Sequence, residues 1–198
     1  MGPTATEEDL VKYAFALFLN HDFAKSLEVA NMGLRKNPRH AAFNRLAMYN
    51  YTDLKRFDEA IKAADIFFNE CDKADYSYLD YMYYGHLLED LKKYDDAVVQ
   101  YEKAVEMDPT KTELYKNISA AYEQKNDYKK AIGAYHKYYS SLDKEKQTPD
   151  LQFQFGRLYY GAGTQPDSLT ITVDERKQAL ASADSVFQAI AVAAPDSY

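Results

Sequence analysis

Apolar and polar residues follow one another along the chain with the spacing of amphipathic helices. Through most of the sequence, apolar side chains recur at steps of three and four residues, which places them on one face of a helix. Short polar breaks interrupt the pattern near the middle of four successive segments, and they read NHD, DLKR, DLKK and QKND. Breaks of this length favour two antiparallel helices joined by a tight turn. The pattern therefore predicts an all-α chain built of helix pairs.

Small residues and aromatics return at fixed places with a period of 34 to 37 residues. In the segment 79–109, Gly85 precedes Ala97 by 12 residues, and Tyr101, Ala104 and Pro109 follow. Small residues at the Gly85 and Ala97 positions let two helices approach closely, so larger side chains there should cost about 1–3 kcal/mol by overpacking. Proline stops the second helix. The equivalent positions in the other segments are Ala14, Ser26, Ala30, Gly33 and Pro38; Met48, Ala60, Ala64, Phe67 and Asp72; and Ser119, Ala131, Tyr135, Tyr138 and Asp143.

A fifth segment repeats the frame with an insertion. Thr148 and Pro149 form a helix start, with threonine as N-cap and proline at the first helical position, and Gly156 takes the place of Gly85. The insertion covers about residues 163–177, after which the frame resumes at Ala183, Phe187, Ile190 and Pro195. Thr172 and Glu175 match the capping-box pattern, so a long last helix is predicted to begin near Val173.

Small residue, aromatic, small residue and proline at this period resemble the tetratricopeptide repeat. The resemblance implies a right-handed superhelical α-solenoid of about five antiparallel helix pairs, ten helices in all, forming a single domain over residues 1–198. The predicted repeats cover about 7–40, 41–74, 78–111, 112–145 and 149–197. The third is the most specific copy, since Gly85 holds its close-approach position, and none of the copies has the family's frequent tryptophan.

The last predicted helix ends in the apolar stretch QAIAVAA. Solenoids need polar capping helices at their ends. We therefore expect the chain to be a segment of a longer protein, or its last helix to associate with another copy.

Carried over residue by residue, the family's concave groove falls on the first helix of each pair. The resemblance implies that these residues line it: Phe15, Arg45, Tyr49, Met82, Tyr83, His86, Lys116, Asn117, Phe153 and Arg157. Aromatic area combined with three cations suits an extended peptide that carries acidic side chains or a free carboxylate. The alternative is that these are ordinary residues of a surface that must be polar.

Composition narrows the function further. The 198 residues carry a net charge of −7, so phosphate backbones are repelled on average and a nucleic-acid role is not expected. The four histidines lie in four different segments without metal-ligand spacing, and the single cysteine excludes a cysteine-based zinc site. The sequence contains no nucleophile elbow, P-loop or dinucleotide-binding motif. It thus indicates no enzyme, metal or cofactor.

The sequence favours a non-enzymatic protein–protein interaction scaffold that binds a peptide or protein in its groove. The alternative is a structural spacer within a larger multidomain protein, and an enzyme role ranks third. No apolar run is long enough to span a membrane. The sequence does not decide the compartment, since a soluble protein of this kind fits the cytoplasm or, if an upstream export signal is removed, the periplasm.

Overall fold

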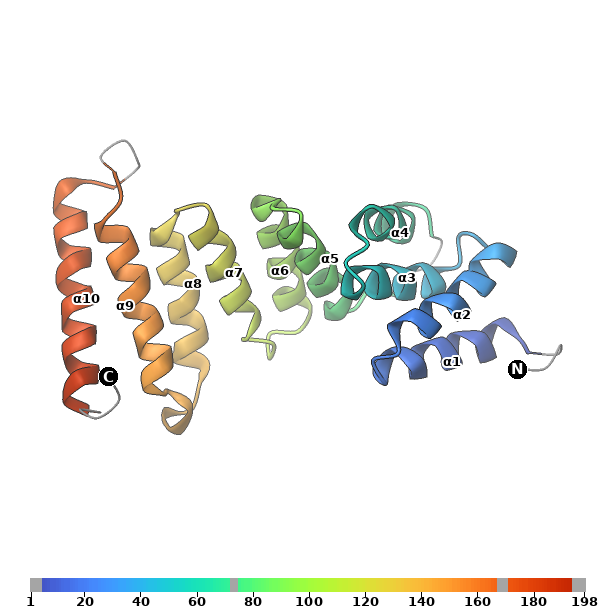
Figure 1. The fold of residues 1–198 in the computed structure, drawn as a ribbon, viewed down its shortest axis with the longest axis horizontal. Helices are drawn as coiled ribbons and strands as arrows, with labels where there is room; N and C mark the ends of the chain where they lie inside the picture. The colour runs from blue at the N-terminus through green and yellow to red at the C-terminus, as the bar shows by residue number, and fades with distance from the viewer. Residues whose placement is uncertain (1–4, 72–74, 167–170, 194–198) are drawn as a thin grey trace. The chain divides into compact units, whose positions relative to one another are not determined.

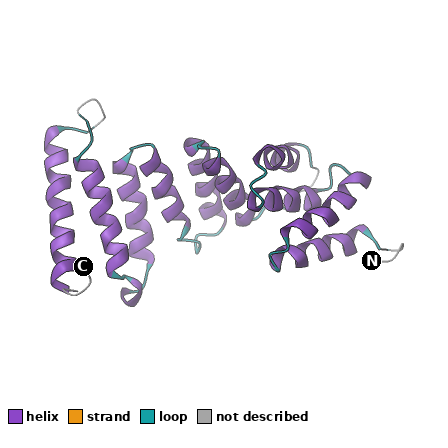
Figure 2. Ribbon diagram, viewed as in Figure 1, coloured by secondary structure: helices purple, strands orange, loops and turns teal. Residues whose placement is uncertain are grey.

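The protein is all-helical in the residues that its computed structural model describes, which are 5–71, 75–166 and 171–193. These residues form ten α-helices and one 3-10 turn, Lys144–Lys146, with no strand among them (Figures 1 and 2). The helices divide between two compact units, Met1–Lys93 and Tyr94–Tyr198. The all-α fold class predicted from the periodicity is confirmed. The prediction of one domain over 1–198 stays a prediction.

The first unit holds five helices. They are α1 (Glu7–Leu19), α2 (Phe23–Lys36), α3 (Ala41–Asp53), α4 (Phe57–Asn69) and α5 (Tyr78–Asp90). α1 packs on α2 and α3 on α4, while α3 also contacts α2 and α5, so the helices stack in chain order. Phe43, Tyr49 and Phe67 are among the side chains that fill the core between them.

The second unit holds the other five helices. They are α6 (Tyr94–Met107), α7 (Leu114–Gln124), α8 (Tyr128–Ser141), α9 (Pro149–Gly163) and α10 (Val173–Ala193). α7 packs on α8 and α9 on α10, with α6 against α7 and α8 against α9. α10 begins at the predicted Val173, where the Thr172 hydroxyl accepts from the Glu175 backbone N–H at 3.2 Å. Pro195 of the predicted frame lies outside the described residues.

The turns inside the helix pairs share one backbone device. His21, Lys55, Lys92 and Asn126 all have a positive φ of 58° or 59°, and each follows a first helix. After His21, the Asp22 N–H donates to the Leu17 carbonyl at 2.9 Å, and the same six-residue bond closes the other three turns. This is the Schellman geometry, which satisfies the carbonyls at the end of a helix. The polar breaks in the sequence are therefore helix C-caps.

In three of the helix pairs, close helix approach occurs where the repeat frame predicts small residues. The Ser119 hydroxyl donates to the Ala131 carbonyl at 2.8 Å, and the Ser26 hydroxyl donates to the Ala14 carbonyl at the same distance. A Cβ added to Gly156 would overlap the Phe187 ring. Small side chains fit at these three crossings, whereas the α3–α4 pair carries the buried Met48 at the same place in the frame.

Candidate partner-binding site

All ten sequence-predicted residues lie on the first helices of their pairs. In the first unit, the structure brings together three of them, Met82, Tyr83 and His86 of α5, in a hollow of about 310 Å³. The end of α3 and its turn complete this hollow, which we call the α3–α5 hollow. Its other lining residues are Thr52, Asp53, Lys55, Glu89 and Asp90.

Tyr83 forms an aromatic wall of the α3–α5 hollow. Its ring stacks on Tyr49 with centroids 4.2 Å apart and meets the Phe18 ring edge-on at 5.9 Å. The Tyr83 hydroxyl reaches toward the Asp53 carboxylate, 3.4 Å away. Burial, helped by the charge of Asp53, raises the pKa of Tyr83, so this hydroxyl remains protonated and a donor.

The charges around the hollow are mainly negative. Lys55 pairs with Asp90 at 2.8 Å, while Asp53 and Glu89 add two further carboxylates. Burial lowers the pKa of His86, an effect that the neighbouring carboxylates oppose. His86 is therefore neutral at pH 7, and the lining carries more negative than positive charge.

The partner-binding residues predicted from the sequence do not include four charged residues of this hollow, Asp53, Lys55, Glu89 and Asp90. The repeat pattern could have indicated two of them. Asp53 and Asp90 occupy the same place in successive repeats, each just before a turn that reads LKR or LKK. Only the packing of α5 on α3 brings the two ends together.

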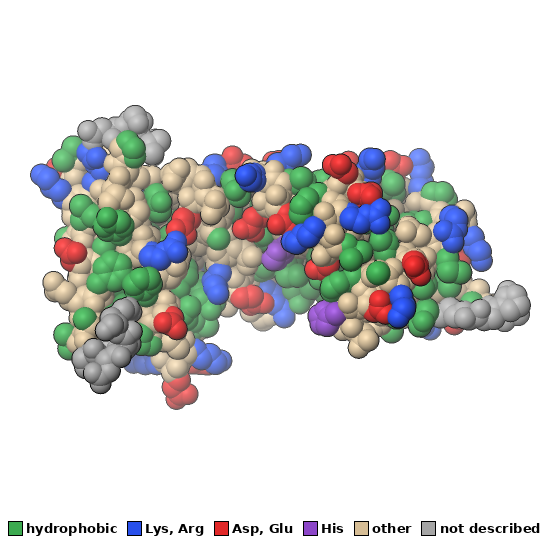
Figure 3. All heavy atoms as spheres, in the orientation of Figure 1, with side chains coloured by type: hydrophobic (Ala, Val, Ile, Leu, Met, Phe, Trp, Pro, Cys, Tyr) green, Lys and Arg blue, Asp and Glu red, His purple; other side chains and the backbone are tan. Residues whose placement is uncertain are grey.

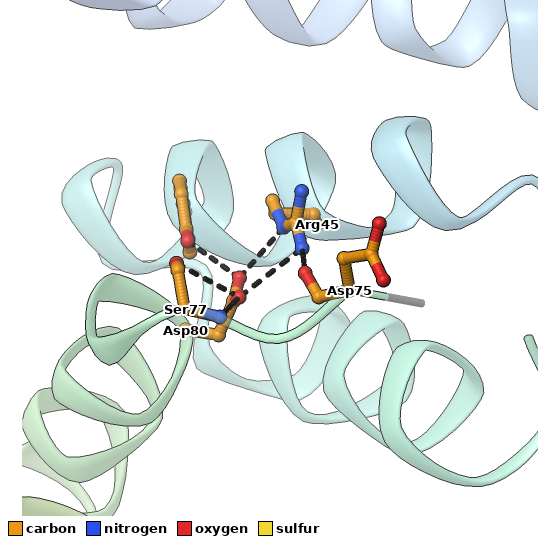
Figure 4. Close-up of polar contacts among 5 residues, drawn as sticks. Arg45, Asp75, Ser77 and Asp80 are labelled. Atoms are coloured by element: carbon orange, nitrogen blue, oxygen red, sulfur yellow. Dashed lines mark hydrogen bonds and ion pairs between the residues drawn. The ribbon is translucent and has the colours of Figure 1, made fainter. Parts of the chain in front are cut away.

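Tyr49 is buried, which corrects its expected place on an open groove, whereas Arg45 keeps 28% of its side chain exposed while it binds a buried carboxylate. Tyr49 is 2% exposed, and its hydroxyl donates to Asp80 Oδ1 at 2.6 Å. Arg45 Nε donates to the same oxygen at 2.7 Å, and its Nη2 donates to Asp80 Oδ2 at 3.2 Å (Figure 4). Asp80 has no exposed surface. A buried carboxylate requires such partners, so Arg45 and Tyr49 hold α3 against α5.

The start of α5 completes this network. The Ser77 backbone N–H and hydroxyl donate to Asp80 Oδ2 at 2.7 and 3.0 Å. Arg45 Nη2 also donates to the Asp75 carbonyl (Figure 4). One carboxylate thus caps its own helix and receives the cation of the neighbouring first helix.

In the second unit, Lys116 and Asn117 line another first-helix hollow. Its volume is about 320 Å³, and Glu113, the N-cap of helix α7, and Ala120 of the same helix complete it. The Lys116 ammonium lies 5.3 Å from the centre of the Tyr138 ring, a cation–π distance. We call this the α7 hollow.

The remaining candidates lie outside both hollows. Arg157 of α9 pairs with Glu123 of α7 at 2.5 Å, so its charge is compensated within the unit. Phe153 is 38% exposed and its ring lies 5.4 Å from that of Phe187. Phe15 of α1 is 44% exposed. The two phenylalanines therefore offer apolar surface, whereas Arg157 acts first as a link between helices.

A further cavity of about 620 Å³ lies among α8, α9 and α10, where none of the ten candidates is found. Its charged residues pair with one another, Lys130 with Asp127 at 3.3 Å and Lys129 with Glu175 at 3.8 Å. The lining of this cavity therefore favours neither a cationic nor an anionic ligand.

In the described part of the chain, no group of three or more His, Cys, Asp or Glu side chains is placed to hold a metal ion. None of its helices is both long and apolar enough to cross a bilayer. On the face shown in Figure 3, acidic and basic side chains are interspersed.

Comparison with known proteins supports the resemblance drawn from the repeat. Residues 81–111 match the family model of the tetratricopeptide repeat. No curated protein matches the chain. The chain contains a tetratricopeptide repeat and has the α-solenoid fold of tetratricopeptide-repeat proteins, as the sequence predicts.

Three solved structures illustrate the fold. The C-terminal part of a TPR repeat-containing protein from Cytophaga hutchinsonii is 23% identical with a TM-score of 0.69, and the match covers 91% of this chain and 63% of that one. This chain thus spans less than two thirds of that structure. MamA from Desulfovibrio magneticus is 15% identical with a TM-score of 0.66, covering 96% and 94%. YrrB, described as a TPR protein with an unusual peptide-binding site, is 14% identical with a TM-score of 0.65, covering 96% and 92%.

Proposed function

We propose that this protein is a non-enzymatic interaction scaffold whose first helices bind a peptide or protein partner. The observation that carries the proposal is the α3–α5 hollow, where Met82, Tyr83 and His86 come together beside ionised side chains. Such a hollow supplies aromatic area and charge, the two features that fix an extended segment in place. The helical repeat fold supports this role, because repeats present extended surfaces to partners.

In the second unit, the α7 hollow suits an acidic side chain or a free carboxylate of the partner. The Lys116 ammonium supplies a cation and the Asn117 amide a hydrogen-bond donor from adjacent positions of α7. Arg157 is less suited to this role, since Glu123 already accepts from its guanidinium.

Site-specific photocrosslinking tests the function and separates it from the structural-spacer alternative. A photoreactive benzoylphenylalanine replaces Met82 or Asn117 on first helices, and Asp65 of α4 or Lys137 of α8 on second helices as matched controls. The two control side chains are exposed. We expect crosslinks in cells from the first-helix positions, and few from the controls. Equal crosslinking from both sets, or none from either, contradicts partner binding on the first helices and favours the spacer.

We also propose that α10 can associate with a second copy of the chain. Val173, Leu180 and Val192 on this helix are 54%, 36% and 84% exposed. Apolar side chains that are exposed in one copy lose contact with water when a second copy covers them. Sedimentation equilibrium tests this: the wild type should form a dimer that Val192→Glu weakens, and a wild-type monomer at all concentrations refutes it.

A further inference from the structure

We propose that the α3–α5 hollow binds a basic side chain, lysine or arginine, of the partner. This inference rests on the proposed function and gives the partner's chemistry at that site. This basic ligand is opposite in charge to the acidic ligand proposed for the α7 hollow, because the residues that line the two hollows differ.

The charge of the lining favours a cation. Three carboxylates, Asp53, Glu89 and Asp90, and one ammonium, Lys55, border the hollow. Lys55 lies 2.8 Å from Asp90 and so compensates one of the three carboxylates. A partner's ammonium or guanidinium entering the hollow therefore meets excess negative charge, and charge-assisted hydrogen bonds to carboxylates are stronger than neutral ones.

The apolar lining suits the same ligand. Tyr83 and Met82 line the hollow, and the stack of Tyr83 on Tyr49 fixes its ring. Tyr49 is itself fixed by its bond to the buried Asp80. An aromatic ring attracts a nearby cation, while methylene stems pack on apolar surface. Lysine and arginine combine both features in one side chain.

The size of the hollow matches a side chain. Its volume of about 310 Å³ lies at the lower end of the range for ligand pockets, about 300–1,000 Å³. A single long side chain anchored there would leave the rest of the peptide on the surface of the first helices.

His86 should make the binding of a basic side chain sensitive to pH. Glu89 and Asp90 of its own helix line the hollow with it, as do Asp53 and Lys55 from the end of α3 and its turn. Neutral His86 does not repel a cation. Once protonated, it adds a positive charge to the lining, so we expect a basic ligand to bind more weakly as the pH falls below the His86 pKa.

Selection from a random dodecapeptide display library on the full chain tests the inference. We expect the wild type to select peptides with a shared lysine or arginine, and synthetic copies with that residue changed to glutamine to lose most of their affinity. Asp53→Asn and Glu89→Gln should each weaken the selected peptide by at least about threefold, and more salt should weaken the wild type. Asp65→Asn removes an exposed carboxylate of α4 and should leave affinity within about twofold.

The outcomes separate the two proposals. Selected peptides that share no basic residue, or equal affinity for Asp53→Asn and Asp65→Asn, overturn the basic-side-chain inference while peptide binding stands. A wild-type protein that selects no peptide overturns the peptide-binding function and this inference together. Circular dichroism of each variant confirms that it is folded, and both changes are nearly isosteric, at the exposed Asp53 and the half-buried Glu89.

Discussion

Arg45 Nε lies 2.7 Å from Oδ1 of Asp80, and the aspartate side chain has no exposed surface. The pair joins the first helix of one repeat, α3, to the first helix of the next, α5. The guanidinium also lies 5.1 Å from the centre of the Phe67 ring. Arg45 therefore stabilises the packing of α3 on α5. A charge reversal at Arg45 would lower the stability of the fold, so any loss of partner binding in that variant would follow from the loss of stability.

We predict that Arg45→Met lowers the free energy of unfolding by about 3 kcal/mol. The reason is that Asp80 would keep its buried charge without its cation. Urea denaturation followed by circular dichroism measures the change. Lys116→Met is the matched control, because Lys116 is exposed on α7, and it should change stability by less than about 0.5 kcal/mol. Equal effects of the two substitutions would show that the Arg45–Asp80 pair adds no stability.

Two glycines should respond in opposite directions to alanine. A Cβ on Gly156 would meet the Phe187 ring, whereas a Cβ on Gly133 has nothing within 4 Å. Both glycines lie inside helices, where alanine is intrinsically favoured. We expect Gly156→Ala to lower stability by about 1–3 kcal/mol through overpacking and Gly133→Ala to raise it by about 0.5–1 kcal/mol. Thermal unfolding of both variants checks this, and a stabilising Gly156→Ala would refute the close approach of α9 and α10.

Glycine should relieve the backbone strain at a turn residue that has a positive φ. Lys92 has φ 58° and an exposed side chain, and a non-glycine residue in this region costs about 1–2 kcal/mol. Lys92→Gly should therefore raise the free energy of unfolding by up to about 1 kcal/mol, part of the gain being offset by the unfolded chain's added freedom. The adjacent Lys93→Gly is the control and should give no gain. A loss of stability in Lys92→Gly would contradict the Schellman geometry at this turn.

Acidification should destabilise the protein partly through His86. Burial lowers its pKa below the ordinary value of 6.5, so the unfolded chain binds the proton more readily than the folded one. At a pH well above 6.5, His86 has no effect on the free energy of unfolding, which falls as the pH drops through 6.5 toward the lower pKa of the folded state. We expect the urea midpoint to fall between about pH 7.5 and about pH 5.5, and His86→Gln to reduce this fall. His136→Gln, at an exposed histidine of α8, is the control, and an unchanged pH dependence in His86→Gln would refute the assignment.

The sequence by itself determined the helix pairs. Small side chains recur at four of the five close-approach positions, and four turns use the same C-cap, so helix packing imposes a period that can be read without coordinates. The start of α9 at Pro149 and of α10 at Val173 also follows from local chemistry, since the N-cap and capping-box residues adjoin the helices that they start.

Only the tertiary structure decided which first-helix side chains are exposed. Arg45 and Tyr49 occupy groove positions in the repeat frame, yet the buried carboxylate of Asp80 binds both. Tyr83 stays on the wall of a hollow because Tyr49 supports its ring. A repeat pattern assigns positions to helix faces, whereas burial depends on the register of one helix against the next and on pairs 31 to 35 residues apart. Those long-range contacts decide which side chains of the first helices remain exposed.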